Sequence, residues 1–96
     1  MRVIWGDEAK AELKAAINFI RQDSYQNSIK VLHGIVAKTK TLSAYPEAHS
    51  LDKYKQNNDG SYRAIEIYRY RIAFRILPDR IIIIRLRHTS MEPLFY

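Results

Sequence analysis

YRAIEIYR-YRIAFRIL-PDR-IIIIRLRH, residues 62–88, is the stretch that decides the fold. Its β-branched and aromatic residues fall in three short runs, which is the composition of β-strands. Pro78-Asp79 marks a turn before the last run. The junction at residues 68–70 holds no Gly, Asn or Asp, so no tight two-residue hairpin is predicted there. The stretch therefore predicts three consecutive strands, with a bulge or a longer crossing at that junction.

Alternation within these runs separates an apolar face from a basic one. In the middle run, Ile72, Phe74 and Ile76 point to one side and the residues between them to the other. Residues 81–84 are apolar on both sides, as in a strand at the centre of a sheet. Phe74 and Ile84 are therefore expected to be buried against helices. The opposite face gathers the arginines Arg71, Arg75, Arg85 and Arg87.

This arginine face has two interpretations. Glu66 is the single carboxylate expected beside it, so four guanidiniums would raise the local electrostatic potential and suit a polyanion. Charged residues equally form the ordinary solvated face of a sheet. The sequence leaves both interpretations open.

The composition describes a single domain, residues 1–96, with one modest core. A hydrophobic share of 47% argues against disorder, and no apolar run has the length of a membrane span. The first residues carry no secretory signal pattern and the chain has no cysteine, so we expect a cytoplasmic protein without disulfides. The net charge of +6 favours nucleic acid or an acidic protein as a partner.

The sequence contains no pattern that indicates a metal or a cofactor. Three scattered histidines without cysteine do not make a zinc site, and His33 and His49 belong to no motif. The glycine motifs that bind phosphates or dinucleotides are missing, as is the serine nucleophile motif.

Two helices are expected before the strands. Arg2–Trp5 predicts a first strand, and apolar spacing predicts a helix over Asp7–Gln22 with Asp7 as its N-cap. Ser24 can cap a second helix that continues to Ala44, and the short connection predicts an antiparallel helical hairpin. The second helix has a wide apolar arc with Val31 at its edge, formed by Tyr25, Ile29, Leu32, Ile35, Val36 and Leu42.

The loop at residues 47–61 also contains basic residues, the lysines Lys53 and Lys55, which stand just before the turn sequence Asn57–Gly60. Its lysines are either solvated or in contact with phosphates and bases. The residues expected to bind nucleic acid are Lys53, Lys55, Arg63, Arg75 and Arg85. The apolar end of the tail, residues 94–96, is expected to dock on the body of the domain.

This order of elements resembles the RelE/ParE superfamily of bacterial toxins from type II toxin–antitoxin modules, over nearly the whole chain. The motifs that carry the resemblance are Asp7-Glu8-Ala9, Leu42-Ser43-Ala44-Tyr45-Pro46, Tyr62-Arg63, Tyr70-Arg71-Ile72-Ala73-Phe74, and Leu86-Arg87-His88 followed by Met91-Glu92-Pro93. The pattern and the resemblance together predict an α+β fold. In it, an antiparallel helical hairpin packs on a largely antiparallel sheet of about four strands.

The resemblance implies a growth-inhibiting toxin but leaves its target open. RelE-like members enter the ribosome and cleave mRNA, whereas ParE-like members poison DNA gyrase and are not known as nucleases. The long helical hairpin is similar to the ParE branch. The arginine face and the terminal tyrosine are similar to the RelE branch, and the arginine face favours mRNA cleavage. A third reading is a basic nucleic-acid-binding module with neither activity.

The resemblance also implies the partners. Both branches are neutralised by a cognate antitoxin whose disordered tail folds onto the toxin. Beyond the antitoxin, the partners would be the ribosome with mRNA, or DNA gyrase. Operator DNA would be contacted only through the antitoxin complex, and no membrane partner is expected.

If the protein cleaves RNA, it would be an endoribonuclease that needs no metal but needs a base, an acid and cations around the phosphate. Arg71 and Arg87 could clamp the phosphate, because a guanidinium matches two of its oxygens. His88 could exchange protons near neutral pH. Glu66 or Tyr96 could be its partner, the tyrosine only if arginines strongly lower its pKa. Ribonuclease-type relatives carry counterparts of Arg71, His88 and Tyr96, although ParE-like relatives often carry the histidine too.

Overall fold

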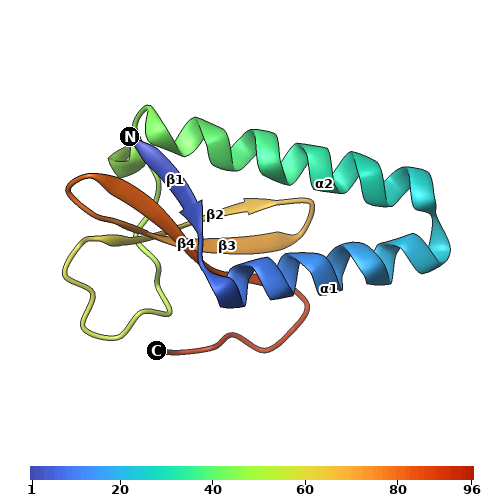
Figure 1. Ribbon diagram of the computed structural model, residues 1–96. Helices are drawn as coiled ribbons and strands as arrows, with labels where there is room; N and C mark the ends of the chain where they lie inside the picture. Colours follow the sequence, from blue (N-terminus) through green and yellow to red (C-terminus); the bar gives the residue numbers. More distant parts are fainter.

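The computed structural model describes all 96 residues and consists of a four-stranded sheet with a helical hairpin on one face (Figure 1). The elements are, in order, β1 (Arg2–Trp5), α1 (Asp7–Asp23), α2 (Tyr25–Lys40), β2 (Tyr62–Ile67), β3 (Tyr70–Ile76) and β4 (Arg80–His88). Two short 3₁₀ turns, Thr41–Ser43 and Pro46–Ala48, follow α2. The predicted α+β fold is therefore confirmed.

The apolar last run of the sequence forms the centre of the sheet. The strand order is β1-β4-β3-β2; β3 is antiparallel to both β2 and β4, and β1 is parallel to β4. Val3 pairs with Ile81 and Trp5 with Ile83. The parallel pairing of β1 and β4 is possible because the long helical hairpin and the β2–β3 hairpin lie between them in the chain.

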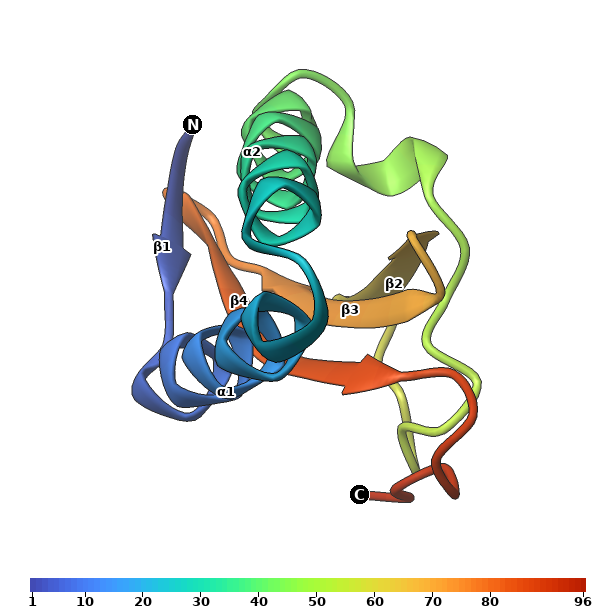
Figure 2. The same cartoon turned by 90° about the vertical axis from the view of Figure 1, so that its right-hand side faces the viewer.

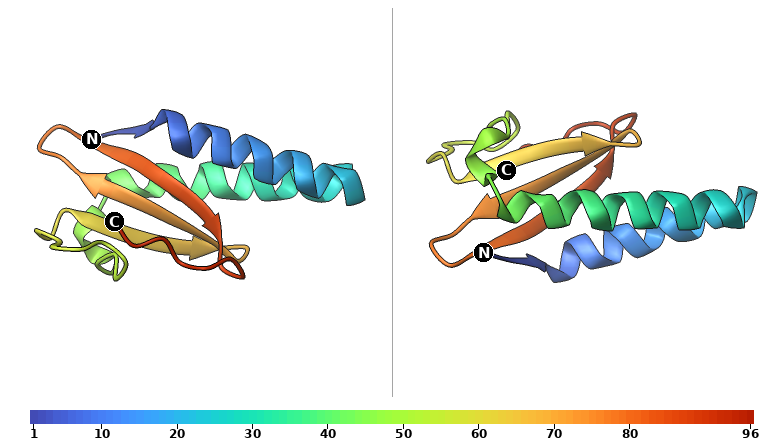
Figure 3. Two further views of the ribbon diagram at one scale, coloured as in Figure 1. Left: turned by 90° about the horizontal axis from the view of Figure 1, so that it is seen from below. Right: turned by 90° about the horizontal axis from the view of Figure 1, so that it is seen from above.

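The hydrophobic core lies between the helices and the sheet. Both helices cover the same face of the sheet, while the loop at residues 51–61 and the C-terminal tail lie on the other side (Figures 2 and 3). Phe74 has no exposed surface, as predicted, and packs with Ile35, Ile72 and Ile83. This core connects all the main elements and fixes the position of the β3 and β4 side chains that point to the opposite face.

The prediction for Ile84 is wrong because β4 contains a bulge. Ala73 pairs with Arg85 but the next residue, Phe74, pairs with Ile83, so Ile84 has no partner across the ladder. Ile84 is only half-buried and lies beside Tyr62, outside the core. A strict period of two does not hold across a bulge.

The buried face of α2 is rotated from the predicted arc. Its fully buried residues include Ser28 and Thr39, whereas Tyr25 is 61% exposed. The two hydroxyls can be buried because they donate to carbonyls of their own helix, at 2.6 Å for Ser28 and 3.0 Å for Thr39. The α-helix also ends at Lys40 and continues only as a 3₁₀ turn, short of the predicted Ala44.

The predicted N-cap is confirmed for α2 but is wrong by one residue for α1. Ser24 caps α2 as predicted, since its hydroxyl accepts a hydrogen bond from the amide of Asn27 at 3.1 Å. The N-cap of α1 is Gly6 rather than Asp7, which is the first helical residue. The amide of Gly6 still donates to the carbonyl of Ile83 at 2.8 Å, so the chain leaves the sheet and enters the helix at this glycine.

The β2–β3 connection is a two-residue turn, contrary to the sequence prediction. Ile67 pairs with Tyr70, and both intervening residues have positive φ, 52° at Tyr68 and 65° at Arg69. A tertiary contact accompanies this turn, because a Cβ placed on Gly34 of α2 would lie only 2.4 Å from the Tyr68 ring. Because Gly34 has no side chain, the Tyr68 ring can pack against α2 from a turn in which the sequence rules would require Gly, Asn or Asp.

Substitution Arg69→Gly should raise the free energy of unfolding by about 0.5–1 kcal/mol. The left-handed backbone costs a non-glycine residue roughly 1–2 kcal/mol, and the greater flexibility of glycine in the unfolded chain takes back part of the gain. Arg80→Gly in β4, where φ is not positive, should instead destabilise the protein. Denaturant titration of both variants checks this, and equal destabilisation would contradict the strained turn.

Candidate functional site

The face of the sheet that carries the arginines is covered by two segments distant in sequence. The loop at residues 51–61 lies along β2, where Leu51 forms a bridge with Arg63. The tail at residues 89–96 runs across the same face (Figure 3). The two segments join each other, since the amide of Gln56 donates to the carbonyl of Tyr96 at 2.8 Å. The arginine face is therefore partly covered: the side chain of Arg71 is 19% exposed, whereas those of Arg75 and Arg85 are 40% and 37% exposed.

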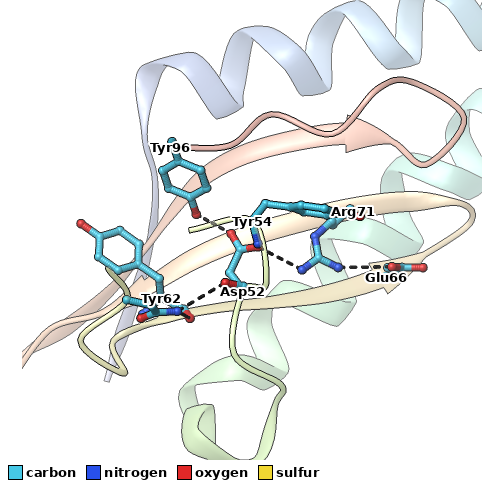
Figure 4. Close-up of polar contacts among 7 residues, drawn as sticks. Asp52, Tyr54, Tyr62, Glu66, Arg71 and Tyr96 are labelled. Atoms are coloured by element: carbon cyan, nitrogen blue, oxygen red, sulfur yellow. Dashed lines mark hydrogen bonds and ion pairs between the residues drawn. The ribbon is translucent and has the colours of Figure 1, made fainter. Parts of the chain in front are cut away.

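Asp52 is the centre of this covered region (Figure 4). It is only 3% exposed, and its Oδ1 accepts from Arg71 Nη2 at 3.0 Å and from the amide of Tyr54 at 3.1 Å. The hydroxyl of Tyr96 donates to its Oδ2. One buried carboxylate thus links the loop, β3 and the tail, as buried charges require partners. Sequence reasoning missed Asp52, because nothing local distinguishes it from a solvated loop carboxylate.

Arg71 is held by two carboxylates. Besides Asp52, it donates to Glu66 at 3.3 Å, and the two residues are direct cross-strand partners. Its guanidinium carbon also lies 4.9 Å from the centre of the Tyr54 ring. The positive charge of Arg71 is therefore already neutralised within the molecule.

Two more arginines of this face are paired as well. Arg75 lies 4.0 Å from a carboxylate oxygen of Asp59 and donates to the hydroxyl of Ser61 at 3.3 Å. Arg85 donates to Glu12 on α1 at 3.0 Å and lies 3.5 Å from Glu8. The hydrogen bond to Glu12 raises the pKa of Arg85. The expectation of a single nearby carboxylate is wrong, because the loop and α1 bring additional acidic residues to the arginines.

Arg87 is the exception among the four. Its side chain makes no ion pair and donates instead to the main-chain carbonyl of Glu92 in the tail at 2.7 Å. It is the cross-strand partner of Arg71. The adjacent His88 accepts from the amide of Ser90 at 3.1 Å through Nδ1. Among the predicted catalytic residues, Arg71 and Tyr96 bind carboxylates, whereas Arg87 and His88 form no hydrogen bond or ion pair with one.

Tyr96 does not have the property that proton abstraction would require. Burial raises its pKa above the usual value, and the hydrogen bond to Asp52 raises it further. The opposing effect of Arg71 is the weakest of the contributions. Tyr96 therefore remains protonated near neutral pH and acts as a donor to Asp52, contrary to the lowered pKa that it would need as the partner of His88; Glu66 was the other candidate for that role.

All five residues predicted to be catalytic nevertheless line one cavity of about 130 Å³, namely Glu66, Arg71, Arg87, His88 and Tyr96. Met91, Pro93 and Leu94 of the tail form its other wall. The structure thus brings together residues that are up to 30 positions apart in sequence. The cavity is smaller than the ~300–1,000 Å³ of typical ligand pockets.

The residues predicted to bind nucleic acid are dispersed. Arg63 shares the helix-facing side with Phe74, its cross-strand partner, and donates to main-chain carbonyls at Glu47 and His49, at 3.2 and 2.8 Å. Lys55 donates to the carbonyl of Tyr96 at 3.2 Å. Lys53 is exposed beside the Tyr54 ring, and Arg75 and Arg85 are ion-paired as described. Arg63 and Lys55 thus fix the loop and the tail rather than join one continuous basic surface.

An apolar groove of about 510 Å³ adjoins the cavity on the side of α1. Its apolar lining comes from α1, β4 and the tail: Ala15, Ala16, Phe19, Leu86 and Met91. Arg87, His88 and Met91 line both the groove and the cavity. No group of three or more His, Cys, Asp or Glu side chains is placed to hold a metal ion. Neither helix combines the length and the apolarity needed to cross a membrane.

A protein-family model matches the chain, and a solved structure shares its fold. The family model described as the ParE toxin of type II toxin-antitoxin system, parDE, matches residues 3–93. The solved structure described as the chromosomal ParDE TA system from P. aeruginosa superposes with a TM-score of 0.71 at 20% identity. The match covers 92% of this chain and 95% of that chain. No curated protein sequence matches. At this identity the structural likeness supports the fold, whereas the family match covers most of the chain.

Proposed function

The chain belongs to the ParE toxin family of type II toxin–antitoxin systems, and from this premise we propose that it arrests growth by poisoning DNA gyrase. Family membership implies a cognate antitoxin as its partner. The target does not follow from membership alone. Since ParE-like toxins are known as gyrase poisons rather than nucleases, the candidate site has to be weighed for the chemistry that RNA cleavage needs.

The observation that carries the proposal is the double pairing of Arg71 with Asp52 and Glu66. A scissile phosphate would have to replace both carboxylates, one of them buried, before this guanidinium could stabilise it. Breaking a buried ion pair leaves an uncompensated charge and costs several kcal/mol. The arrangement suits a residue that holds the fold together better than one that binds a transferring phosphoryl group.

The state of Tyr96 supports the same proposal. A general base has to lose its proton near the working pH, and the raised pKa of Tyr96 opposes this. The small volume of the cavity also leaves no room for a nucleotide while the tail is in place. A toxin that acts by contact with a protein target needs neither a free base nor an open phosphate site.

Ribosome-dependent mRNA cleavage is the second candidate, and one observation favours it. The five residues proposed for catalysis line a single cavity, and neither Arg87 nor His88 is paired with a carboxylate there. If the tail moved away on the ribosome, these residues would face the mRNA together. The dispersed lysines and arginines give less support to a nucleic-acid-binding module without activity.

Arg71→Ala separates the two candidates. Loss of one electrostatic donor from a catalytic site typically reduces the rate by ~10²–10³, which would restore growth if the protein were a nuclease. A gyrase poison should stay toxic, provided that the variant folds. Primer extension on a translated transcript after induction should show no new ends for the wild type or the variant. Cuts within codons for the wild type alone would favour the nuclease.

The antitoxin should bind through an acidic and apolar tail. The motivating features are the net charge of +6 and the exposed apolar side chains of the helical hairpin, Phe19 and Tyr25. Co-expression with the small gene next to the toxin gene should yield a complex that co-purifies at low salt and loses affinity as salt rises. Separate recovery of both proteins at low salt would contradict this.

A further inference from the structure

The C-terminal tail is hydrogen-bonded near its start and at its last residue, with a largely exposed apolar stretch between them. Met91, Leu94 and Phe95 are 51%, 41% and 65% exposed, although all three are large apolar residues. Only Tyr96 is partly buried. At its start, the amide of Thr89 donates to the carbonyl of Arg69 at 2.7 Å and the carbonyl of Glu92 accepts from Arg87 at 2.7 Å, whereas residues 93–95 make no hydrogen bond. Segments with few buried contacts open at low free energy.

The bonds that hold the end converge on residue 96. Its amide donates to the carbonyl of Tyr54 at 3.1 Å, and its own carbonyl accepts from the amide of Gln56 at 2.8 Å. Its hydroxyl donates to the buried carboxylate of Asp52. Its ring meets that of Tyr62 edge to face, with centroids 6.0 Å apart. The charge-assisted bond to Asp52 is the strongest single type of contact in this set.

The tail lies between a cavity and a groove that share lining residues. On one side of Arg87 is the cavity of about 130 Å³ under the tail, and on the other is the apolar groove of about 510 Å³ against α1. Met91 of the tail lines both spaces. If the tail moved, the two spaces would join into one site, and Arg87 would lose its bond to the carbonyl of Glu92.

We propose that residues 89–96 form a releasable strap, latched to Asp52 through the Tyr96 hydroxyl, and that its release opens a site for an acidic, apolar peptide segment. Arg87, the arginine of this face without a carboxylate partner, would bind an acidic side chain of that segment. Leu86, Ala16 and Phe19 would receive its apolar side chains. Single-stranded nucleic acid fits less well, because its phosphates gain little from the apolar lining of the groove.

Closure of the strap lowers the apparent affinity for any such peptide. While the strap is closed, the apparent affinity is reduced in proportion to the small open population. Weakening the latch should therefore tighten peptide binding by the factor by which it increases opening. Tyr96→Phe removes the hydroxyl bond to Asp52 and keeps the ring. A hydrogen bond to a charged group corresponds to a change of about tenfold or more in the opening equilibrium.

Two measurements on the whole protein test the strap. Amide hydrogen exchange at Gln56 and residue 96 reports opening, because both amides bond across the latch. Titration with a short synthetic peptide of alternating leucine and glutamate, followed at the main-chain amide signals of His88 and Met91, reports access to the site. The matched control is Tyr45→Phe, since Tyr45 is 78% exposed and its hydroxyl makes no hydrogen bond. A tetrauridine oligonucleotide serves as the competing probe.

The expected result for Tyr96→Phe is about tenfold faster exchange at both amides and a matching gain in peptide affinity. Adding Arg87→Gln should abolish the gain, and Tyr45→Phe should change neither quantity. Unchanged exchange would overturn the latch, and faster exchange without an affinity gain would overturn the gating. A gain for tetrauridine instead of the peptide would show that the site takes nucleic acid. Neither readout involves gyrase or RNA cleavage, so failure here is distinct from failure of the proposed target.

Discussion

Phe74→Ala should lower the free energy of unfolding by about 3–5 kcal/mol, the usual range for a large aromatic truncated in a core. Phe74 has no exposed surface and lies on β3, a strand paired on both sides, where it packs with residues from α2 and β4. The edge of the His49 ring also contacts it, with centroids 6.0 Å apart. These neighbours belong to different elements and cannot all collapse into the space that the ring leaves.

The bulge in β4 provides a control for that prediction. Ile84 is apolar and lies on β4, the strand next to that of Phe74, but it is only half-buried and lies outside the core. Ile84→Ala should therefore cost clearly less than the 2–5 kcal/mol typical of a buried isoleucine. Chemical denaturation of both variants measures the difference. Equal costs would show that Ile84 belongs to the core and that the bulge is misplaced.

Asp52→Ala should destabilise the protein by about 3 kcal/mol, near the lower end of the range for removing one partner of a buried ion pair. Asp52 accepts from Arg71, Tyr96 and the amide of Tyr54, and all three donors lose this partner at once. Arg71 keeps its bond to Glu66, which moderates the loss. The loop and the tail are then joined mainly by main-chain bonds.

Glu66→Ala is the matched comparison for Asp52→Ala. Its carboxylate pairs with the same arginine, but its side chain is 57% exposed, so the loss should stay within about 1 kcal/mol. The double variant Asp52→Ala with Arg71→Ala should cost less than the sum of the single variants, because the two residues interact directly. Additive costs would contradict the assignment of Asp52 as the anchor of Arg71.

The fold was predictable where a residue pattern is local. Period-two alternation located β3 and β4, and helical spacing with Ser24 as a cap located the hairpin. The errors arose where tertiary contacts override local preference. Ile84 left the core because one extra residue sits in β4, and Tyr68 adopts positive φ in a turn that packs against a glycine of α2.

Part of the grouping in the candidate site was predictable, but its electrostatics were not. The alternation of β3 and β4 placed Arg71 and Arg87 on one face, and both line one cavity with His88, which the alternation did not place there. Their counter-charges could not be predicted, because Asp52 lies in an irregular loop and Glu12 on a helix. No periodicity relates such positions to a sheet face. A chain with a net charge of +6 can still pair three of the four arginines of this sheet face with its own carboxylates.

We propose that this ParE-family toxin acts on gyrase and that Arg71 has a structural role. The measurement that tests it most directly is gyrase-dependent cleavage of supercoiled plasmid by the purified wild-type toxin and by folded Arg71→Ala. Both proteins should increase the amount of cleaved DNA to a similar extent, and neither should do so without gyrase. Unchanged gyrase activity with the wild-type toxin, at concentrations that arrest growth, would contradict the proposal.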